Sequence, residues 1–262
     1  MRADQLLVMR GLASSRTLAQ RLIAAGRVHA GAVLVRKPAD ALPEDAELSL
    51  EPGADDRFVS RGGLKLEAAL AHAEVTVDGL VCLDVGQSTG GFTDCLLRAG
   101  ASRVVGVDVG HGQLDARLRA DPRVVCLERI NARTLTPEAL GPSMPDGGFP
   151  LIVADLSFIS LLPVLAALRG LGAEGAMLVA LVKPQFELGA QALDRHGIVR
   201  DPQAPVKAFA IVAAQARALG WTDCRHHDSP IAGGDGNREG FLVARWPRTA
   251  VPGAPSHRTP SR

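Results

Sequence analysis

From Leu80 onward the sequence alternates short apolar runs with helical patterns, and this alternation constrains the fold more than any other feature. Seven runs are predicted strands: "LVCLDV", "RVVGVDV", "RVVCLER", "PLIVADLS", "AMLVALVKP", "TDCRHHDSP" and "GFLVARW". Helices are predicted between them at "GFTDCLLRA", "GQLDARLRA", "SLLPVLAALRGL" and "PVKAFAIVAAQARALG". Continuous apolar strands separated by helices are typical of a parallel sheet covered on both faces. We therefore predict an α/β fold with a mostly parallel seven-stranded sheet, whose last two strands form an antiparallel hairpin at one end.

Residues 1–55 are predicted to form a separate, small α+β domain. Two segments, "ADQLLVMRGL" and "SSRTLAQRLIAAGRV", carry apolar residues at helical spacing. The segment "VHAGAVLVRKP" predicts a turn and a short strand, and "AELSLEP" predicts another strand. The polar, glycine-bearing stretch 56–63 is the predicted linker, and 64–247 the larger domain, which opens with the helix "LKLEAALAHAEV". The Pro/Ser/Arg-rich tail, 248–262, is predicted to be disordered.

Basic residues gather in the first domain. The whole chain has a formal net charge of +1, whereas residues 1–38 hold seven basic side chains and one acid, Asp4. Such asymmetry indicates a polyanion-binding module, although a solvated arginine-rich helix face is the alternative. The chain has no Tyr and no aromatic residue before Phe58, so this domain cannot stack on single-stranded bases. We expect it to bind RNA through phosphates and shape, with these contacts: Arg2, Arg16, Arg21, Arg27, Lys37 and Arg61.

Cysteine spacing and hydropathy exclude several other classes. The four cysteines are dispersed, without C-x-x-C spacing, so we expect neither a metal site nor a disulfide framework. No apolar run approaches the length of a bilayer span, and no signal-peptide pattern opens the chain. We expect a cytoplasmic monomer with no membrane partner.

The loop "LDVGQSTGGFTD" follows the first predicted strand and opens a helix, as a ligand-binding glycine turn does. A phosphate-binding P-loop would need a lysine where Phe92 stands, and the dinucleotide fingerprint would need a glycine at Ser88. The strand ends in Asp84, whose negative charge repels phosphate. We therefore predict a nucleoside-like ligand without phosphates, and S-adenosylmethionine (SAM) fits this description.

Polar residues also follow the next strands, at the edge where open α/β sheets bind ligands. Asp108 lies 22 residues after Gly86, a spacing at which an acid binds ribose hydroxyls, and Asn131 stands where an adenine edge would lie. For any one of them, helix capping is the alternative. Gln87 is left open between a cofactor contact and a solvent-facing position. The predicted cofactor-binding residues are Asp84, Gly86, Gln87, Ser88, Thr89, Gly90, Gly91, Phe92, Asp108, Asn131 and Asp155.

An ordered set of motifs resembles one known family. The motifs are "RADQLLVMRGLASSRTLAQRLIAAGRV", "FVSRGGLKLEAAL", "LDVGQSTGGFTDCLL", "VVGVDVGHGQL", "VADLSFISL", "LVKPQFE" and "GNREGFL". Over residues 2–246 they resemble the TlyA family, bacterial 2′-O-ribose methyltransferases of ribosomal RNA often labelled hemolysin A. The larger domain is similar to FtsJ-like methyltransferases, and the smaller one to the RNA-binding domain of ribosomal protein S-four. The resemblance implies a Rossmann-like fold, SAM as cofactor, ribosomal RNA and subunits as partners, and cytidine as the modified nucleotide.

That family uses a Lys-Asp-Lys-Glu tetrad, which the resemblance carries onto Lys65, Asp155, Lys183 and Glu239. A ribose hydroxyl is a poor nucleophile until it loses its proton, and a lysine accepts a proton only where desolvation or a second lysine lowers its pKa. We expect Lys183 to be the base, oriented by Asp155. Lys65 is then a positioning cation, and Glu239 completes the network. The alternative makes Lys65 a surface residue and Lys183 a capping residue.

Two further functions belong to other classes. One is an RNA-binding factor for ribosome assembly with an inactive methyltransferase domain, and the other is a membrane-active hemolysin. The complete tetrad and the pair Asp84 and Asp108 argue against the first. The lack of a signal peptide or an apolar span argues against the second.

Overall fold

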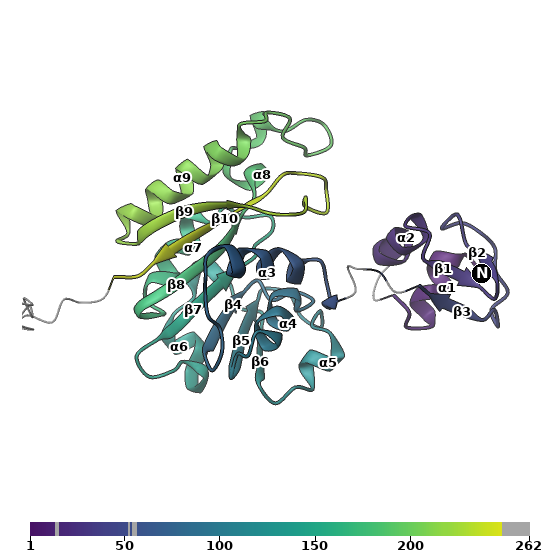
Figure 1. Ribbon diagram of the computed structural model, residues 1–262, viewed down its shortest axis with the longest axis horizontal. Coiled ribbons are helices and arrows are strands. Elements are labelled where there is room, and N and C mark those ends of the chain that lie inside the picture. Colours follow the sequence, from purple (N-terminus) through teal and green to yellow (C-terminus); the bar gives the residue numbers. More distant parts are fainter. Residues whose placement is uncertain (14–15, 52, 54–56, 248–262) are drawn as a thin grey trace, which may run out of the picture. The chain divides into compact units, whose positions relative to one another are not determined.

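The chain folds into two compact units that divide between Arg57 and Phe58 (Figure 1). The computed structural model describes residues 1–13, 16–51, 53 and 57–247, with only the backbone of Thr17 and Arg21. The predicted tail, 248–262, lies outside the described residues. Each unit has a hydrophobic cluster of its own. The domain bounds 1–55 and 64–247 stay predictions.

The first unit packs two helices on a small antiparallel sheet, as predicted. Its elements are α1 (Ala3–Met9), α2 (Arg16–Ala24), β1 (Val28–Ala30), β2 (Val33–Leu34) and β3 (Leu48–Leu50), with strand order β2-β1-β3. The segment predicted as a turn and a short strand after Val28 has a strand on each side of its turn, where Gly31 takes a left-handed conformation (φ 59°) between β1 and β2. Leu7, Ile23 and Val28 are fully or almost fully buried between helices and sheet.

The second unit is built on a seven-stranded sheet, which confirms the predicted fold class. Its strands are β4 (Val81–Val85), β5 (Arg103–Asp108), β6 (Val124–Glu128), β7 (Phe149–Ala154), β8 (Gly172–Val182), β9 (Thr222–Asp228) and β10 (Gly240–Arg245). The order is β6-β5-β4-β7-β8-β10-β9, and the β10 pairings with β8 and β9 are antiparallel. The last two strands pair as predicted, but β10 lies inside the sheet. Its apolar residues suit that place, whereas the polar strand β9 suits an edge.

Helices cover both faces of this sheet. Successive side chains along a strand point to opposite faces, so both faces are apolar and each forms a hydrophobic cluster with its own helices. The helices are α3 (Gly62–His72), α4 (Gly91–Arg98), α5 (Ala116–Arg119), α6 (Pro137–Leu140), α7 (Leu162–Arg169), α8 (Pro184–Glu187) and α9 (Ala204–Ala218). In β4, Cys82 belongs to the cluster with α3 and α4, whereas Leu83 and Val85 belong to the cluster with α7 and α9.

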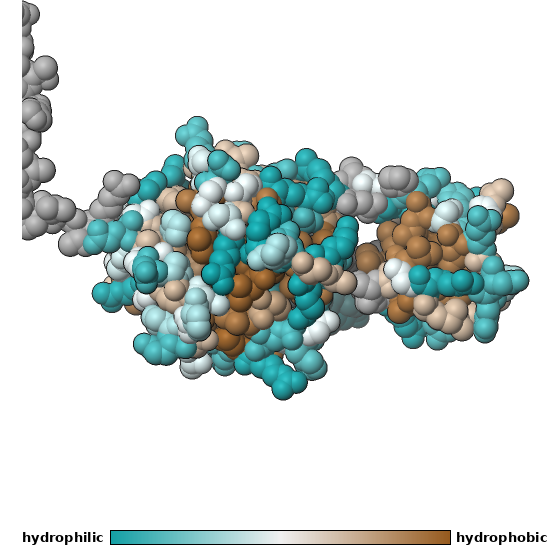
Figure 2. Space-filling view, turned by 90° about the horizontal axis from the view of Figure 1, so that it is seen from below, coloured by the Kyte–Doolittle hydropathy of each residue, from teal (hydrophilic) through white to brown (hydrophobic). Residues whose placement is uncertain are grey.

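On the face in Figure 2 the projecting side chains of this unit are mostly hydrophilic, with apolar residues between them. Among the described residues, no helix is long and apolar enough to cross a bilayer.

The short helices α6 and α8 were not predicted from the sequence, and α5 is shorter than the helix predicted there. Pro137 and Pro184 stand in the first turns of α6 and α8, a position that favours proline. The helix predicted from Gly112 begins only at Ala116. Gly112 is left-handed (φ 65°), and the Asp115 carboxylate caps the helix by accepting a hydrogen bond from Arg117 N.

The end of the predicted linker packs with the second unit. Phe58 is buried, and a Cβ on Gly63 would lie 2.3 Å from its ring. Val59 N donates to Asp94 Oδ2 at 2.9 Å. Phe58 and Gly63 therefore pack within the second unit, and α3 begins at Gly62, inside the predicted linker.

We expect Val164→Ala to lower the free energy of unfolding of the second unit by about 2 kcal/mol, since Val164 is fully buried on α7. The matched control is Val206→Ala on α9, where the side chain is 55% exposed and the expected change is below about 0.5 kcal/mol. Urea unfolding measures both changes. Equal losses in the two variants would contradict the described packing.

Candidate active site

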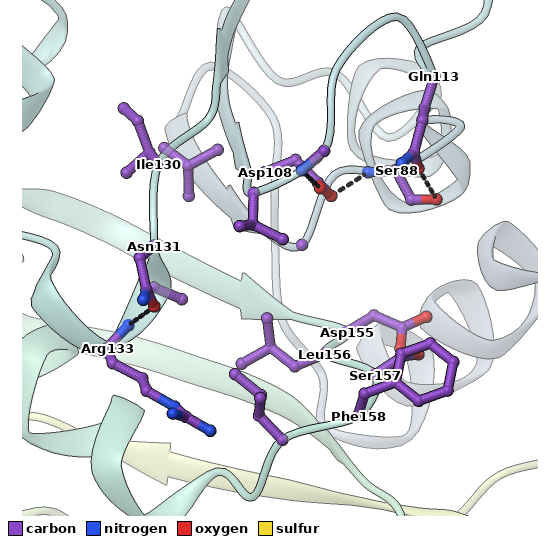
Figure 3. Close-up of a pocket in the computed structure, with 16 residues that line it drawn as sticks. Ser88, Asp108, Gln113, Ile130, Asn131, Arg133, Asp155, Leu156, Ser157 and Phe158 are labelled. Carbon is purple, nitrogen blue, oxygen red and sulfur yellow. Dashed lines mark hydrogen bonds between the residues drawn. The ribbon is translucent and has the colours of Figure 1, made fainter.

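The carboxyl ends of β4, β5, β6 and β7 meet around a pocket of about 460 Å³ (Figure 3). Five of the predicted cofactor residues line it: Gly86, Ser88, Asp108, Asn131 and Asp155. Gly86 forms the turn after β4 in a left-handed conformation (φ 89°). A Cβ at this glycine would lie 2.3 Å from the backbone oxygen of Asp155, so only glycine lets the loop lie so close to the end of β7.

Asp108 is held in place by two backbone amides. Its Oδ2 accepts a hydrogen bond from Ser88 N at 2.8 Å, and its Oδ1 accepts one from Gly110 N at 2.7 Å. Ser88 Oγ donates to Gln113 Oε1 at 3.1 Å, so Gln113 joins the pocket wall, a residue that the sequence analysis missed (Figure 3). Asn131 also caps a short 3-10 helix by accepting from Arg133 N at 3.0 Å, the structural role weighed as the alternative for it.

Asp84 and Gln87 lie beneath the glycine loop and are not among the residues that line the pocket. Thr93 Oγ1 donates to Asp84 Oδ2 at 2.6 Å and accepts from Gln87 Nε2 at 2.9 Å. A Cβ on Gly106 would lie 2.0 Å from the side-chain amide of Gln87, so β5 needs a glycine at this position. The solvent-facing position left open for Gln87 is therefore wrong, because its side chain is 3% exposed. It is buried as a support of the loop, and its contact with a cofactor stays a prediction.

The other predicted loop residues are also held by packing within the protein. A Cβ on Gly90 would lie 2.3 Å from Leu118, and one on Gly91 would lie 2.1 Å from Ser60 Oγ. The Phe92 ring is buried and stacks on Phe241 with centroids 6.2 Å apart. Thr89 is half-buried, and its carbonyl oxygen accepts from Asp115 N. These glycines let α3 and α5 approach the loop. Like Asp84 and Gln87, the four residues stay predictions as cofactor contacts.

The four tetrad residues come together in two ion pairs, one buried and one partly exposed at Asp155, although they are distant in sequence. Lys65 Nζ on α3 lies 2.5 Å from Glu239 Oε2, and Lys183 Nζ lies 2.6 Å from Asp155 Oδ1. Gly240 pairs with Val182, so the antiparallel register places Glu239 beside Lys183 at the end of β8. The structure thus places all four at the edge of the sheet that carries the pocket, and Asp155 belongs to both.

The surroundings of the ion pairs change the pKa of Glu239. Burial raises the pKa of Glu239 above its ordinary value of 4.5, and the nearby charges of Lys65 and Lys183 oppose that rise. Lys183 Nζ also donates to Ser157 Oγ at 2.9 Å. Ser157 lines the pocket, so its hydroxyl connects the pocket wall to the ammonium group.

Ser157 and Phe158 were not predicted, although both follow Asp155 in the quoted motif "VADLSFISL". Phe158 is 88% exposed at the pocket wall, has a left-handed backbone (φ 66°) and lies 5.7 Å from the Phe186 ring. An exposed phenyl ring beside a polar site offers a flat surface for stacking. Their position after a strand end, rather than their residue types, was the signal available in the sequence.

In the first unit, the fully buried Asp4 joins two of the predicted RNA contacts. Arg2 Nε donates to Asp4 Oδ1 at 3.0 Å, and Arg16 donates to Oδ2 at 3.1 Å. The hydrogen bond from Arg2 is the largest cause that holds the pKa of Asp4 well below its usual range. Both guanidinium groups stay about half exposed, so Asp4 fixes their positions without covering them.

The remaining predicted RNA contacts have separate surroundings. Arg27 donates to the Glu51 carbonyl at 2.8 Å, and Lys37 is exposed. Arg61 is half-buried at the start of α3, in the second unit. The side chain of Arg21 lies outside the described part of the chain. All six stay predictions as RNA contacts.

We expect the charge state of Asp84 to give folding stability a pH dependence. Burial raises its pKa from 3.8 to about 7, so between these values the folded state keeps a proton that the unfolded state releases. Stability from this group is therefore greatest at low pH and falls as pH rises to about 7. Urea unfolding at about pH 5 and about pH 8 should show this loss in wild type and less of it in Asp84→Asn. Exposed Asp146→Asn is the control and should behave as wild type. An equal pH dependence in all three would contradict the raised pKa.

Comparison with known proteins shows the family. The FtsJ-like methyltransferase family matches residues 58–246, and the S4 domain family matches residues 1–48. The 16S/23S rRNA (cytidine-2′-O)-methyltransferase TlyA of Mycobacterium tuberculosis is 48% identical over 95% of this chain and 90% of its own length. Hemolysin A of Brachyspira hyodysenteriae is 36% identical over 91% of this chain and 97% of its own.

A solved structure has the same arrangement. A protein from Streptococcus thermophilus that is named as a hemolysin matches with a TM-score of 0.75 and 38% identity, over 96% of this chain and 91% of its own. Sequence and structure agree over nearly the whole length of both chains. The chain therefore belongs to the TlyA family of FtsJ-like methyltransferases, with an S4 domain at its N-terminal side.

Proposed function

We propose that this enzyme transfers a methyl group from SAM to a ribose 2′-hydroxyl of ribosomal RNA, on cytidine. The observation that carries the proposal is the Lys183–Asp155 ion pair, because Asp155 lines the pocket while Lys183 stands behind it. The site thereby places a group that can accept a proton beside a group that can bind a cofactor. The name of the Mycobacterium tuberculosis relative supports the same reaction.

The pocket has the size and chemistry that SAM requires. A volume of about 460 Å³ falls within the range of small-molecule sites. Two backbone amides hold Asp108 as a fixed acceptor, which suits the two hydroxyls of the SAM ribose. Asn131 and Ile130 lie on the wall where an adenine ring would pack. When bound, SAM supplies an activated methyl group, and its positive charge suits a wall that contains Asp108 and Asp155.

In the proposed mechanism, Lys183 accepts the proton of the ribose hydroxyl. Asp155 and Ser157 hold the Lys183 nitrogen from two sides. Glu239 balances the charge of Lys65, so removal of either partner would leave a buried charge without compensation. The exposed ring of Phe158 gives a flipped nucleotide a surface to stack on.

We propose that the first unit holds the RNA through its phosphates. Arg2 and Arg16 are fixed by a buried carboxylate and half exposed, a geometry suited to phosphate oxygens. A ribosomal RNA substrate supports a cytoplasmic location. A monomer is consistent with the site, because one chain supplies all four residues of the tetrad.

We expect Lys183→Ala to lower tritiated methyl transfer from SAM to ribosomal RNA by about 10²- to 10⁴-fold, the range of positioned acid–base groups. SAM affinity, measured by calorimetry, should stay unchanged. The matched control is Lys207→Ala, since Lys207 is an exposed α9 lysine paired with Asp201. Equal incorporation by wild type and Lys183→Ala would refute the assigned base. SAM binding by wild type without any transfer would instead favour an RNA-binding assembly factor.

We also expect RNA affinity to fall steeply with salt. Each phosphate contact adds about −0.9 to the slope of log affinity against log salt for duplexes, so Arg16→Ala should make the slope shallower by about one. Arg103→Ala is the control, since Arg103 is exposed at the start of β5, at the opposite edge of the sheet from the pocket. Filter binding across a salt series measures all three slopes, and a wild-type slope near zero would contradict phosphate binding.

A further inference from the structure

The buried side chain of Asn237 joins three segments that surround the tetrad. Its Nδ2 donates to Asp235 Oδ2 and to the Gly197 carbonyl, each at 3.0 Å, and its Oδ1 accepts from Val199 N at 2.8 Å. Gln185 Nε2 donates to the same Asp235 oxygen at 3.1 Å. Asn237 is 1% exposed, so its side chain is shielded from water, whereas Asp235 is exposed and Gly197 and Val199 are half-buried. We call this group of five residues the Asn237 node.

The node is adjacent in sequence to two members of the tetrad. Gln185 follows Lys183 by two residues, and Asn237 precedes Glu239 by two. The loop also turns back on the glutamate, because Gly233 N donates to the Asn237 carbonyl at 2.8 Å. A Cβ on Gly233 would lie 2.5 Å from Glu239 Oε1, so this loop forms a wall of the glutamate site.

Sheet pairing alone does not fix the two side chains. Val182 and Gly240 are the last paired residues of β8 and β10 at this edge, so Lys183 and Glu239 stand just beyond the ladder. Beyond that point the chain continues into α8 and into an irregular loop. The hydrogen bonds of the node connect these two continuations to each other and to the segment around Val199.

We propose that Asn237 is a positioning residue for methyl transfer, which holds Lys183 and Glu239 in register through the Asn237 node. The inference rests on the proposed function, and it assigns to Asn237 no contact with SAM or RNA. Loss of its amide removes the hydrogen bonds that join the loop before Glu239 to the segment around Val199, and it loosens the chain next to the two side chains. Small displacements of reacting groups are costly, since about 1 Å can lower a rate by about 10²-fold.

Two variants separate positioning from mere folding. Asn237→Asp keeps an oxygen for Val199 N but replaces the donor with an acceptor that faces the Asp235 carboxylate. The exchange variant Asp235→Asn/Asn237→Asp restores one donor and one acceptor between the two positions. The control is Gln191→Ala, which removes an exposed amide from the neighbouring 3-10 helix.

The experiment measures kcat for methyl transfer, KM for ribosomal RNA, SAM affinity by calorimetry and the melting temperature of each variant. We expect Asn237→Asp and Asn237→Ala to lower kcat about 10- to 100-fold with KM and SAM affinity unchanged. The exchange variant should recover most of the kcat of the wild type, and Gln191→Ala should match the wild type.

The pH profile gives a readout that folding alone would not move. Burial raises the pKa of Glu239 in the presence of Lys65, Lys183 and Asp155. A loosened loop admits water and lets this pKa fall towards its ordinary value. Glu239 must be ionised to balance Lys65, so the acid limb of kcat should move to lower pH in Asn237→Ala, which adds no charge of its own.

The outcomes separate this inference from the proposed function. No methyl transfer by wild type refutes the proposed function itself. With an active wild type, an Asn237→Asp variant that keeps its kcat, or a folded Asn237→Ala variant that keeps its acid limb, overturns the role of Asn237 alone. A loss of kcat that follows melting temperature, without recovery in the exchange variant, overturns it too. If Asn237→Ala does not fold, Asn237→Asp and the exchange variant decide in the same way.

Discussion

Two ion pairs at the carboxyl edge of the sheet, the buried Lys65–Glu239 and the partly exposed Lys183–Asp155, form only when several elements of the second unit are correctly placed. Burying a charge is costly unless its partner lies at the right distance. The partners come from α3, β7, β8 and the start of β10, so the sheet order and the packing of α3 must both be correct before either pair can form. A fold that is slightly displaced would leave charges buried and unpaired.

The glycine loop shows how the same edge is kept rigid before any ligand binds. Asp84, Thr93 and Gln87 form a buried hydrogen-bonded chain beneath the loop, and Gly106 leaves room for the glutamine amide. Gly86 brings the loop against the backbone of Asp155. Because Asp155 also pairs with Lys183, the loop that lines the pocket is in direct contact with the residue that pairs with the proposed base. The proposed cofactor site and the proposed catalytic site are therefore one packed assembly.

The sequence predicts the sheet well because buried parallel strands require continuous apolar runs, and the strand ends then locate the pocket. It does not predict which side of a turn a side chain takes, so a solvent-facing position was left open for Gln87, whose side chain is buried. The position of β10 inside the sheet depends on pairing with β8, which is distant in sequence, so no local pattern predicts it. The tetrad came from family resemblance, since nothing local marks Lys65 on its helix, whereas Ser157 and Asn237 gain meaning only from their three-dimensional neighbours.

Identification of the methylated product tests the central claim most directly. Ribosomal RNA that lacks the modification is incubated with the enzyme and SAM, digested to nucleosides and analysed by chromatography with mass spectrometry. Proton removal from a ribose hydroxyl predicts 2′-O-methylcytidine as the new nucleoside, with the methyl group on the sugar fragment. A methyl group on the base, or no new methylated nucleoside, would contradict the account.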